Sequence, residues 1–296
     1  MSLSDNIEVF LAVVQTASIS EAAKLLFISQ STVSYRLKLL EDELECRLID
    51  RVRGQGHCEL TREGQNFLLI AEKTRNIQHE IARFKNDSKM PTLRIGSAES
   101  IAFYLLDTLL EPDKMRLEYT LGGTDSIYKM MASGQLDAGY VIYFKKVDGL
   151  KIRPIYSEEM VVCATPGMFE PGIVIEPENL NFDRFVEFNW TETRTRSWVD
   201  HWRDNKSGLY FTTNAPCMAV RFMQSHHAWS LMPESMARRI STDMQMETYK
   251  LTEPPPDRVC YRLEPVSGRF HNKEMLEIWD EKVDRYIRSL DYLKVL

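Results

Sequence analysis

Residues 18–44 read Ser-Ile-Ser-Glu-Ala-Ala-Lys-Leu-Leu-Phe-Ile-Ser-Gln-Ser-Thr-Val-Ser-Tyr-Arg-Leu-Lys-Leu-Leu-Glu-Asp-Glu-Leu. In the second half of this stretch, Val33, Leu37, Leu40 and Leu44 recur at the spacing of one helix face, which predicts a buried seam. A shorter apolar helix precedes it, and Ser29 is suited to cap the second helix after a short turn. Two helices joined in this way are typical of a helix-turn-helix, whose second helix enters the DNA major groove.

The other face of the second helix carries side chains that can contact DNA. Gln can pair with adenine, Arg with guanine, and Ser or Thr with bases or phosphates. Any solvated helix face can carry such residues, but a further helix over residues 4–17 and a hairpin predicted around Gly54-Gln55-Gly56 favour a winged helix-turn-helix over residues 1–60. The candidate DNA-binding residues are Ser29, Gln30, Ser31, Thr32, Ser34, Tyr35, Arg36, Lys38, Arg51 and Arg53.

A long linker helix is predicted over residues 61–88, beginning after Thr61 as its cap. Its apolar residues follow a narrow heptad seam, which favours a helix paired with a second copy of the chain; the alternative is a core helix of a single domain. A hinge is predicted at residues 89–92, where Pro91 breaks the helix. The seam consists of Phe67, Ile70, Thr74, Ile77, Ile81 and Phe84.

Composition bounds the class of protein. The chain has 296 residues, 44% hydrophobic and 27% charged residues, and a formal net charge of −6, which fits a globular protein of two or more domains. No apolar run is long enough to span a membrane and no signal peptide is recognisable, so we expect no membrane partner and a cytoplasmic location. The negative charge suits DNA binding only if basic residues cluster, and such a domain should bind non-specific DNA modestly.

Residues 93–296 alternate predicted strands and helices, which is typical of α/β folds with parallel strands. Ligands of such folds bind at the carboxyl ends of strands, near helix N-termini. Ser and Thr at these positions are often simple helix caps, so capping is the alternative interpretation. The candidate effector-binding residues selected in this way are Ser97, Ala98, Glu99, Ser100, Thr124, Asn189, Trp190, Thr191, Thr193 and Arg194. Glu99 favours a cationic or zwitterionic ligand, unless it pairs with Arg194 or Arg196.

The N-terminal motifs resemble those of LysR-type transcriptional regulators, and the resemblance covers nearly the whole chain. The matching motifs, in order, are Ser20-Glu-Ala-Ala-Lys-Leu-Leu, Ser29-Gln30, Val33-Ser34, Leu39 to Leu44, Leu48-Ile-Asp-Arg51, Leu60-Thr61 and Gly64. Two positions depart from the family pattern: Ser31 stands where Pro is usual, and Tyr35 stands where Arg is usual, with Arg36 one place later. These departures put the individual base contacts in question, whereas the fold assignment is unaffected.

The resemblance implies an α/β protein with three parts: the winged helix-turn-helix, the dimerising linker helix and a two-lobed effector domain like a periplasmic binding protein. Lobe one is expected over about residues 93–160 and 265–296, and lobe two over about 161–264. The resemblance also implies a homodimer or homotetramer that binds double-stranded DNA at an interrupted palindrome. A small-molecule effector would then alter transcription, with RNA polymerase as a further partner.

Other classes of function lack support in the sequence. No GxSxG, HExxH, Walker or GxGxxG motif is present, so we expect no enzyme, no catalytic residue and no cofactor. The five cysteines are scattered without a CxxC pair, and His201, His226 and His227 lack partners at ligand spacing, so we expect no metal site. The cysteines are interpreted as idle thiols, with a peroxide-sensing pair as the alternative. The alternative function is an effector-independent DNA-binding repressor or architectural protein.

Overall fold

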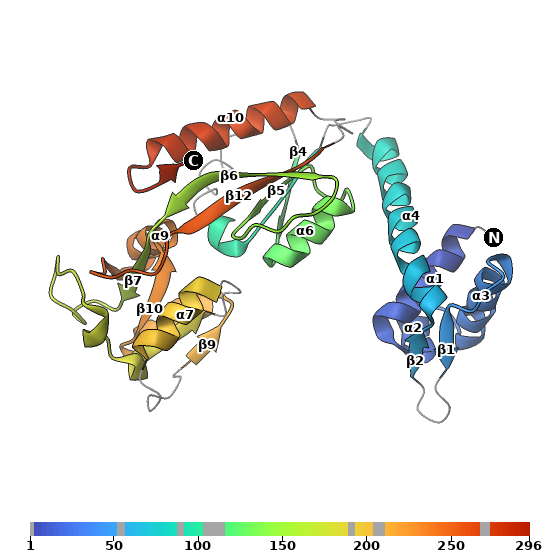
Figure 1. Ribbon diagram of the computed structural model, residues 1–296, viewed down its shortest axis with the longest axis horizontal. Coiled ribbons are helices and arrows are strands. Elements are labelled where there is room, and N and C mark those ends of the chain that lie inside the picture. The colour runs from blue at the N-terminus through green and yellow to red at the C-terminus, as the bar shows by residue number, and fades with distance from the viewer. Residues whose placement is uncertain are drawn as a thin grey trace. The chain divides into compact units, whose positions relative to one another are not determined.

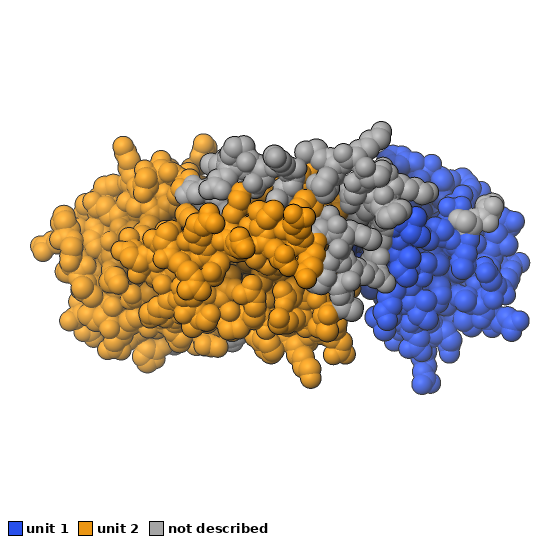
Figure 2. Space-filling model, turned by 90° about the horizontal axis from the view of Figure 1, so that it is seen from above, with its two compact units in different colours: residues 1–90, 133–135 blue, residues 91–132, 136–296 orange. Residues whose placement is uncertain are grey.

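The computed structural model describes residues 3–51, 57–87, 92–102, 116–188, 193–203, 211–266 and 273–296. The chain divides into two compact units (Figure 2). The N-terminal unit comprises residues 1–90 with residues 133–135, and the C-terminal unit comprises residues 91–132 and 136–296. Among the described residues, no helix combines the length and the apolar character needed to cross a membrane.

The N-terminal unit is a bundle of helices with a two-stranded wing (Figure 1). Its elements are α1 Leu3–Thr16, α2 Ile19–Leu25, α3 Gln30–Glu43, β1 Ile49–Arg51, β2 Cys58–Leu60 and α4 Arg62–Asp87. Phe10, Val33 and Leu40 are fully buried in a common core, as the helical spacing predicts. Leu44, the last residue of the predicted buried seam, is instead 36% exposed, because α3 ends at Glu43. β1 and β2 pair antiparallel, with Ile49 opposite Leu60, which confirms the predicted hairpin strands.

Gly64, in the first turn of α4, permits the wing to pack closely on that helix. A Cβ atom at this position would lie 2.1 Å from the carbonyl oxygen of Leu48, which is far inside van der Waals contact. The hydroxyl of Thr61 accepts a hydrogen bond from the Gly64 amide at 2.9 Å, so Thr61 caps α4 as predicted.

Lobe one of the C-terminal unit is a six-stranded sheet in the order β13-β6-β12-β5-β3-β4. Its elements are β3 Thr92–Ser97, β4 Arg116–Leu121, α6 Thr124–Ala132, β5 Ala138–Val141, β6 Leu150–Glu158, β12 Arg258–Pro265, α10 Lys273–Ser289 and β13 Lys294–Val295. The helices α6 and α10 cover opposite faces of the sheet (Figure 1). Side chains alternate along β5, so Tyr140 packs with α10 whereas Val141 packs with α6.

Lobe two is a five-stranded sheet in the order β11-β7-β10-β8-β9. Its elements are β7 Met160–Ala164, β8 Phe185–Phe188, α7 Thr193–Trp202, β9 Phe211–Thr213, α8 Pro216–His226, β10 Trp229–Pro233, α9 Glu234–Met244 and β11 Glu247–Tyr249, with short 3₁₀ helices at Pro177–Asn179 and Phe182–Arg184. All residues of β7 and β10 are buried, as expected for central strands with both faces covered.

The structure corrects the boundary between the lobes. Lobe two was expected to extend to residue 264, but β12 pairs with β5 and β6, so residues 258–264 belong to the sheet of lobe one. The backbone hydrogen bonds of a strand are satisfied by the sheet it joins, and those of β12 are made with β5 and β6. Two chain segments therefore cross between the lobes, one between β6 and β7 and one between β11 and β12.

Candidate DNA-binding and effector-binding sites

The N-terminus of α3 is organised by Ser29. Its hydroxyl accepts a hydrogen bond from the Thr32 amide at 3.1 Å and lies 2.8 Å from the hydroxyls of both Ser31 and Thr32. Ser29 itself has an extended backbone, which is the usual conformation of a capping residue. The predicted cap is confirmed, and the cluster fixes three of the candidate hydroxyls at the start of the helix.

The candidate side chains of α3 differ in exposure. Gln30, Ser31 and Lys38 are exposed, and Tyr35 is 55% exposed, whereas Thr32, Ser34 and Arg36 are half-buried. The Nε atom of Arg36 is buried without a hydrogen-bond partner among the described residues. Tyr35 is therefore the large side chain that projects from this part of the helix. Arg51 lies in β1 but its side chain is outside the described structure, as is the whole of Arg53.

The turn before α3 holds an exposed aromatic residue that the sequence did not single out. Phe27 has a φ of 54° and its side chain is 95% exposed. A left-handed backbone is unfavourable for a residue with a Cβ atom, and this ring gains no burial in return. The backbone of Phe27 is therefore strained, and it lies in the turn that precedes α3.

The heptad seam of α4 divides into a buried and an exposed part. The ring of Phe67 packs edge-on against Phe10, with centroids 5.3 Å apart, so Phe67 belongs to the core of its own unit. Further along the helix Ile70, Ile77 and Ile81 are 57%, 48% and 54% exposed. The side chain of Phe84 lies outside the described structure. An exposed apolar stripe of this kind marks a surface for association.

In lobe one, four of the predicted effector residues follow one another at residues 97–100, from the end of β3 to the first turn of the next helix, and this segment is called the Ser97–Ser100 loop. Ser97 is fully buried, and its hydroxyl donates to the Ala98 carbonyl at 2.9 Å and lies 2.6 Å from the Tyr119 hydroxyl. Because a serine has one proton, Tyr119 must donate in the second bond, so Ser97 uses its proton within the protein. Burial also raises the pKa of Tyr119, which keeps that donor protonated. Ser97 thus has a structural role at the end of β3.

Ser100 in the same loop has a different role. Its hydroxyl accepts a hydrogen bond from Nη1 of Arg258 at 2.6 Å, so its own proton can be donated elsewhere. Glu99 beside it is half-buried, and burial raises the pKa of its carboxyl above the ordinary value. Ala98 is buried and donates its amide to the Tyr140 carbonyl at 3.2 Å.

Thr124 is the first residue of α6, in another part of lobe one. It is 4% exposed, and its hydroxyl is buried without a hydrogen-bond partner among the described residues. A buried hydroxyl without a partner is unfavourable by about 1–3 kcal/mol, so this group is suited to bind a polar ligand atom or a water. Asp125 next to it is paired with Lys145 at 2.9 Å, and the hydrogen bond from Lys145 lowers the pKa of the Asp125 carboxyl.

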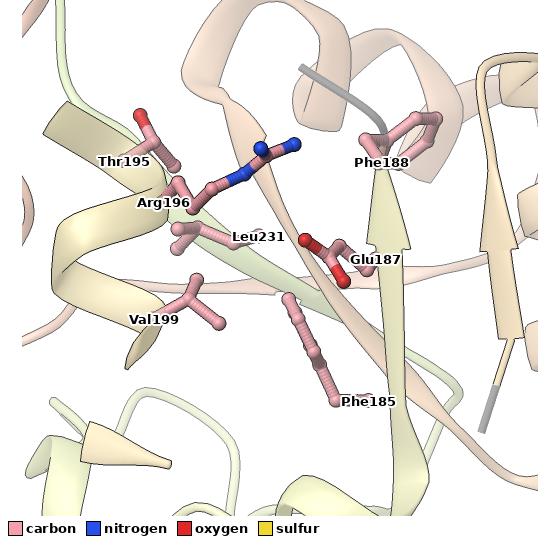
Figure 3. A pocket seen from close by; sticks show the side chains of 7 residues that line it. All are labelled: Phe185, Glu187, Phe188, Thr195, Arg196, Val199 and Leu231. Carbon is pink, nitrogen blue, oxygen red and sulfur yellow. The ribbon is translucent and has the colours of Figure 1, made fainter. Parts of the chain in front are cut away.

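The lobe-two candidates are described only in part. Asn189, Trp190 and Thr191 lie outside the described residues, Thr193 begins α7 with an undescribed side chain, and Arg194 is exposed. The structure instead shows a pocket between α7 and β8, into which Arg196 and Glu187 both point (Figure 3). Its volume of about 10 Å³ accommodates roughly one water molecule. Glu187 and Thr195 line this pocket and were not selected from the sequence.

A second hollow of about 600 Å³ lies beside α9 and β11 and was also not predicted. Its charged side chains pair with acidic neighbours: Arg238 with Glu234 at 2.7 Å, and Lys250 with Glu159 at 3.1 Å. The guanidinium of Arg238 also lies 4.5 Å from the ring centroid of Tyr292, which follows α10. Of these contacts, the one between Arg238 of α9 and Tyr292 joins lobe two to lobe one.

The histidines and cysteines have local structural surroundings. The ring of His226 stacks on Phe222 with centroids 4.1 Å apart, and Nδ1 of His227 lies 3.1 Å from the Thr165 hydroxyl. Among the described residues, no group of three or more His, Cys, Asp or Glu side chains is placed to hold a metal ion. Burial raises the pKa of Cys163 and of Cys260 to about 12, which makes both thiols poor nucleophiles.

Arg258 and Glu158 are functional candidates that the sequence did not reveal, because they are a hundred residues apart. They face each other across β12 and β6, and Nε of Arg258 donates to Oε1 of Glu158 at 3.2 Å. Burial opposes the charge of the guanidinium, but the carboxylate of Glu158 outweighs it, and the pKa of Arg258 is raised. The pair lies at the junction of the two lobes, next to the Ser97–Ser100 loop.

Relatives of known type share parts of this sequence. It is 29% identical over 169 residues to the HTH-type transcriptional regulator YofA of Bacillus velezensis, covering 54% of this chain and 58% of that protein. It is 27% identical over 197 residues to a probable RuBisCO transcriptional regulator of Cyanidioschyzon merolae, covering 62% of this chain and 64% of that protein. The matched part is thus less than two thirds of the length of either relative.

Solved structures show the same fold over nearly the whole chain. Full-length CbnR complexed with its target DNA superposes with a TM-score of 0.61 at 16% identity, and the match covers 97% of this chain and 100% of the CbnR chain. A cysteine variant of full-length OxyR from Pseudomonas aeruginosa superposes with a TM-score of 0.58 at 20% identity, covering 96% and 94%. At these identities the likeness establishes the fold.

Two family models match the sequence, one for each unit. The model of the bacterial regulatory helix-turn-helix protein of the lysR family matches residues 4–65. The model of the LysR substrate binding domain matches residues 86–263, which is more than half of the chain. Together with the winged helix-turn-helix and the two α/β lobes, these matches show that the chain belongs to the LysR family of bacterial transcriptional regulators.

Proposed function

We propose that this chain binds a two-fold symmetric DNA operator as a homodimer or homotetramer through α3. The arrangement of α3 carries the proposal: Ser29 fixes the helix start, and Gln30, Tyr35 and Lys38 project from its exposed face. A recognition helix reads bases with side chains at its N-terminal end, while basic residues further along bind phosphate. Gln30 is thus assigned to a base, Lys38 to a phosphate, and Tyr35 to a neighbouring base or sugar. Ser31, Thr32, Ser34, Arg36, Arg51 and Arg53 remain part of the proposed interface.

The operator can be found by selection from random duplexes with the full chain, followed by binding measurements at several salt concentrations. Lys38→Ala should weaken binding to all sequences alike and reduce the slope of log K against log salt by about one. Gln30→Ala should reduce discrimination at one base position by about 1–3 kcal/mol. Lys73→Ala, an exposed lysine of α4, is the control and should change neither quantity. Recovery of no shared sequence by the selection would contradict site-specific binding.

The dimer is proposed to form through α4. Its exposed isoleucines, Ile70, Ile77 and Ile81, recur at the spacing of one helix face and can pack against the same residues of a second copy. Pairing of this kind would place two α3 helices against two half-sites, which is why a palindromic operator is expected. Assembly to a tetramer and contact with RNA polymerase are further expectations from the family.

The effector is proposed to bind in the C-terminal unit, at the Ser97–Ser100 loop and Thr124, with the start of α7 contributing from lobe two. Ser100 offers a proton and Thr124 an unpartnered hydroxyl, so the ligand should carry polar oxygen or nitrogen atoms. Glu99 is acidic and half-buried, which favours a ligand that also has a cationic group, such as an amino acid or another zwitterion. No catalytic role is proposed for these residues.

Thermal shift of the full chain tests this assignment with amino acids, their N-acetyl derivatives and simple carboxylates. Binding at a hundredfold excess over Kd should stabilise the protein by about 2.7 kcal/mol. An amino acid should stabilise more than its N-acetyl derivative, and Glu99→Gln should abolish that difference. An equal effect of both compounds would contradict the role of Glu99. An absence of any shift across the panel would favour an effector-independent repressor.

A further inference from the structure

A buried ion pair occupies the point where the chain passes between the two lobes. Glu158 is the last residue of β6, β7 begins at Met160, and Arg258 is the first residue of β12. The side chains of Arg258 and Glu158 are 2% and 0% exposed, and Nε and Nη2 of Arg258 both donate to Oε1 of Glu158. Charges buried to this extent are stable only when each has a partner.

The pair extends into lobe one through the remaining nitrogen of Arg258. Nη1 donates to the hydroxyl of Ser100 at 2.6 Å. Ser100 is 3% exposed and lies in the first turn of the helix after β3, next to the half-buried Glu99. The position of the guanidinium is therefore linked to the position of the proposed effector-binding loop.

The pair extends into lobe two through the second carboxylate oxygen. Oε2 of Glu158 accepts a hydrogen bond from the amide of Ser235 at 2.9 Å. The first amides of a helix have no partner within the helix, and Pro233 at the cap position of α9 supplies no side-chain cap. The carbonyl of Glu159 accepts from the preceding amide, that of Glu234, at 2.9 Å. Glu158 thus acts as the cap of α9, and its negative charge is favourable at a helix N-terminus.

We propose that Arg258 and Glu158 form a relay that couples the Ser100 loop of lobe one to the N-terminus of α9 in lobe two. A ligand that displaces Ser100 removes one partner of a buried guanidinium, which then shifts relative to Glu158. The carboxylate caps α9 with its other oxygen, so the shift changes the strength of that cap. Through this relay, ligand binding at the effector site would act on lobe two. This regulatory role rests on the proposed function, because it requires the effector to bind at Ser100.

Hydrogen exchange of the Ser235 amide in the full chain without ligand tests the relay, with single-residue resolution from fragmentation. Ser100→Ala removes the lobe-one link and should accelerate exchange at Ser235 by about 2- to 30-fold, the usual range of such coupling. Ser97→Ala is the matched control: Ser97 is buried in the same loop and bonds to Tyr119, without contact to the ion pair, and should leave Ser235 unchanged. Unchanged exchange at Ser235 in Ser100→Ala would overturn the relay.

A double-mutant cycle tests whether Arg258 carries the coupling. Arg258→Lys keeps a cation beside Glu158 but removes the separate guanidinium nitrogens that hold Glu158 and Ser100, so adding Ser100→Ala should cause no further acceleration. An additive effect would show that the coupling bypasses Arg258 and would overturn the proposal. If Arg258→Lys does not fold, Glu158→Gln replaces it, because the amide can still accept from Ser235 but lacks the charge that holds Arg258. These measurements need no ligand, so they fail or succeed independently of the effector screen.

Discussion

Arg262 of β12 binds Asp280 of α10 through two parallel hydrogen bonds, Nε to Oδ1 at 2.9 Å and Nη2 to Oδ2 at 2.8 Å. The Arg262 side chain is 1% exposed, and its guanidinium also lies 5.6 Å from the ring centroid of Tyr140. Trp279 donates its indole N–H to the Tyr140 hydroxyl at 2.8 Å. The pair therefore fixes α10 on the sheet of lobe one by a polar contact within an apolar layer.

Replacing Asp280 by Asn should destabilise the C-terminal unit because it leaves the buried charge of Arg262 without its counterion. We expect a loss of about 3 kcal/mol in the free energy of unfolding, measured by urea denaturation. Asp284→Asn is the control on the same helix, since Asp284 and Arg288 are 56% and 61% exposed and form a surface pair. The control should cost less than about 1 kcal/mol. Equal losses in the two variants would contradict a special role for the Arg262 pair.

Phe27→Asn should stabilise the N-terminal unit by about 1 kcal/mol, because Asn tolerates the left-handed backbone that Phe27 adopts. The ring is 95% exposed, so its removal loses little burial. Thermal unfolding measures the gain. Phe27→Ala removes the ring but keeps the strained Cβ, and should not reproduce it; a gain of the same size in the alanine variant would show that the ring, not the backbone, is responsible.

Ile77→Asp should weaken the proposed dimer at least tenfold, about 1.4 kcal/mol, because it places a charge in the apolar stripe of α4 in both copies. Sedimentation equilibrium of the full chain measures the change in dissociation constant. Gln65→Asp introduces the same charge at an exposed position of α4 away from the stripe and should leave association intact. An unaltered mass of Ile77→Asp would rule out this face as the dimer interface.

Glu99→Gln should raise the melting temperature at pH 7 but not at pH 4. Burial raises the pKa of Glu99 in the folded chain above its ordinary value, so the folded state favours the protonated carboxyl. Its contribution to stability is therefore present below the unfolded pKa and is lost as the pH rises through the folded pKa. The glutamine variant does not titrate, so its advantage should grow between pH 4.5 and 7. A difference in melting temperature that stays constant over this range would contradict the burial effect.

Sequence alone determined the N-terminal unit because its contacts are local. Helical spacing predicted a buried seam of four residues, of which Val33, Leu37 and Leu40 are buried and Leu44 is not. The capping preferences of Ser29 and Thr61 predicted the starts of α3 and α4. Patterns of this kind depend on residues that are neighbours in the sequence, so local spacing is enough to predict them.

Only the tertiary structure decided how the candidate effector residues are used. Ser97 and Ser100 look alike in the sequence, but their hydroxyls are used differently. The Ser97 hydroxyl donates its proton to the Ala98 carbonyl, whereas the Ser100 hydroxyl accepts from Arg258 and can still donate its own proton. The role of Ser100 depends on Arg258, which is 158 residues away in the sequence. Local patterns cannot specify which distant groups meet, because that choice is made by the packing and hydrogen bonding of the whole fold.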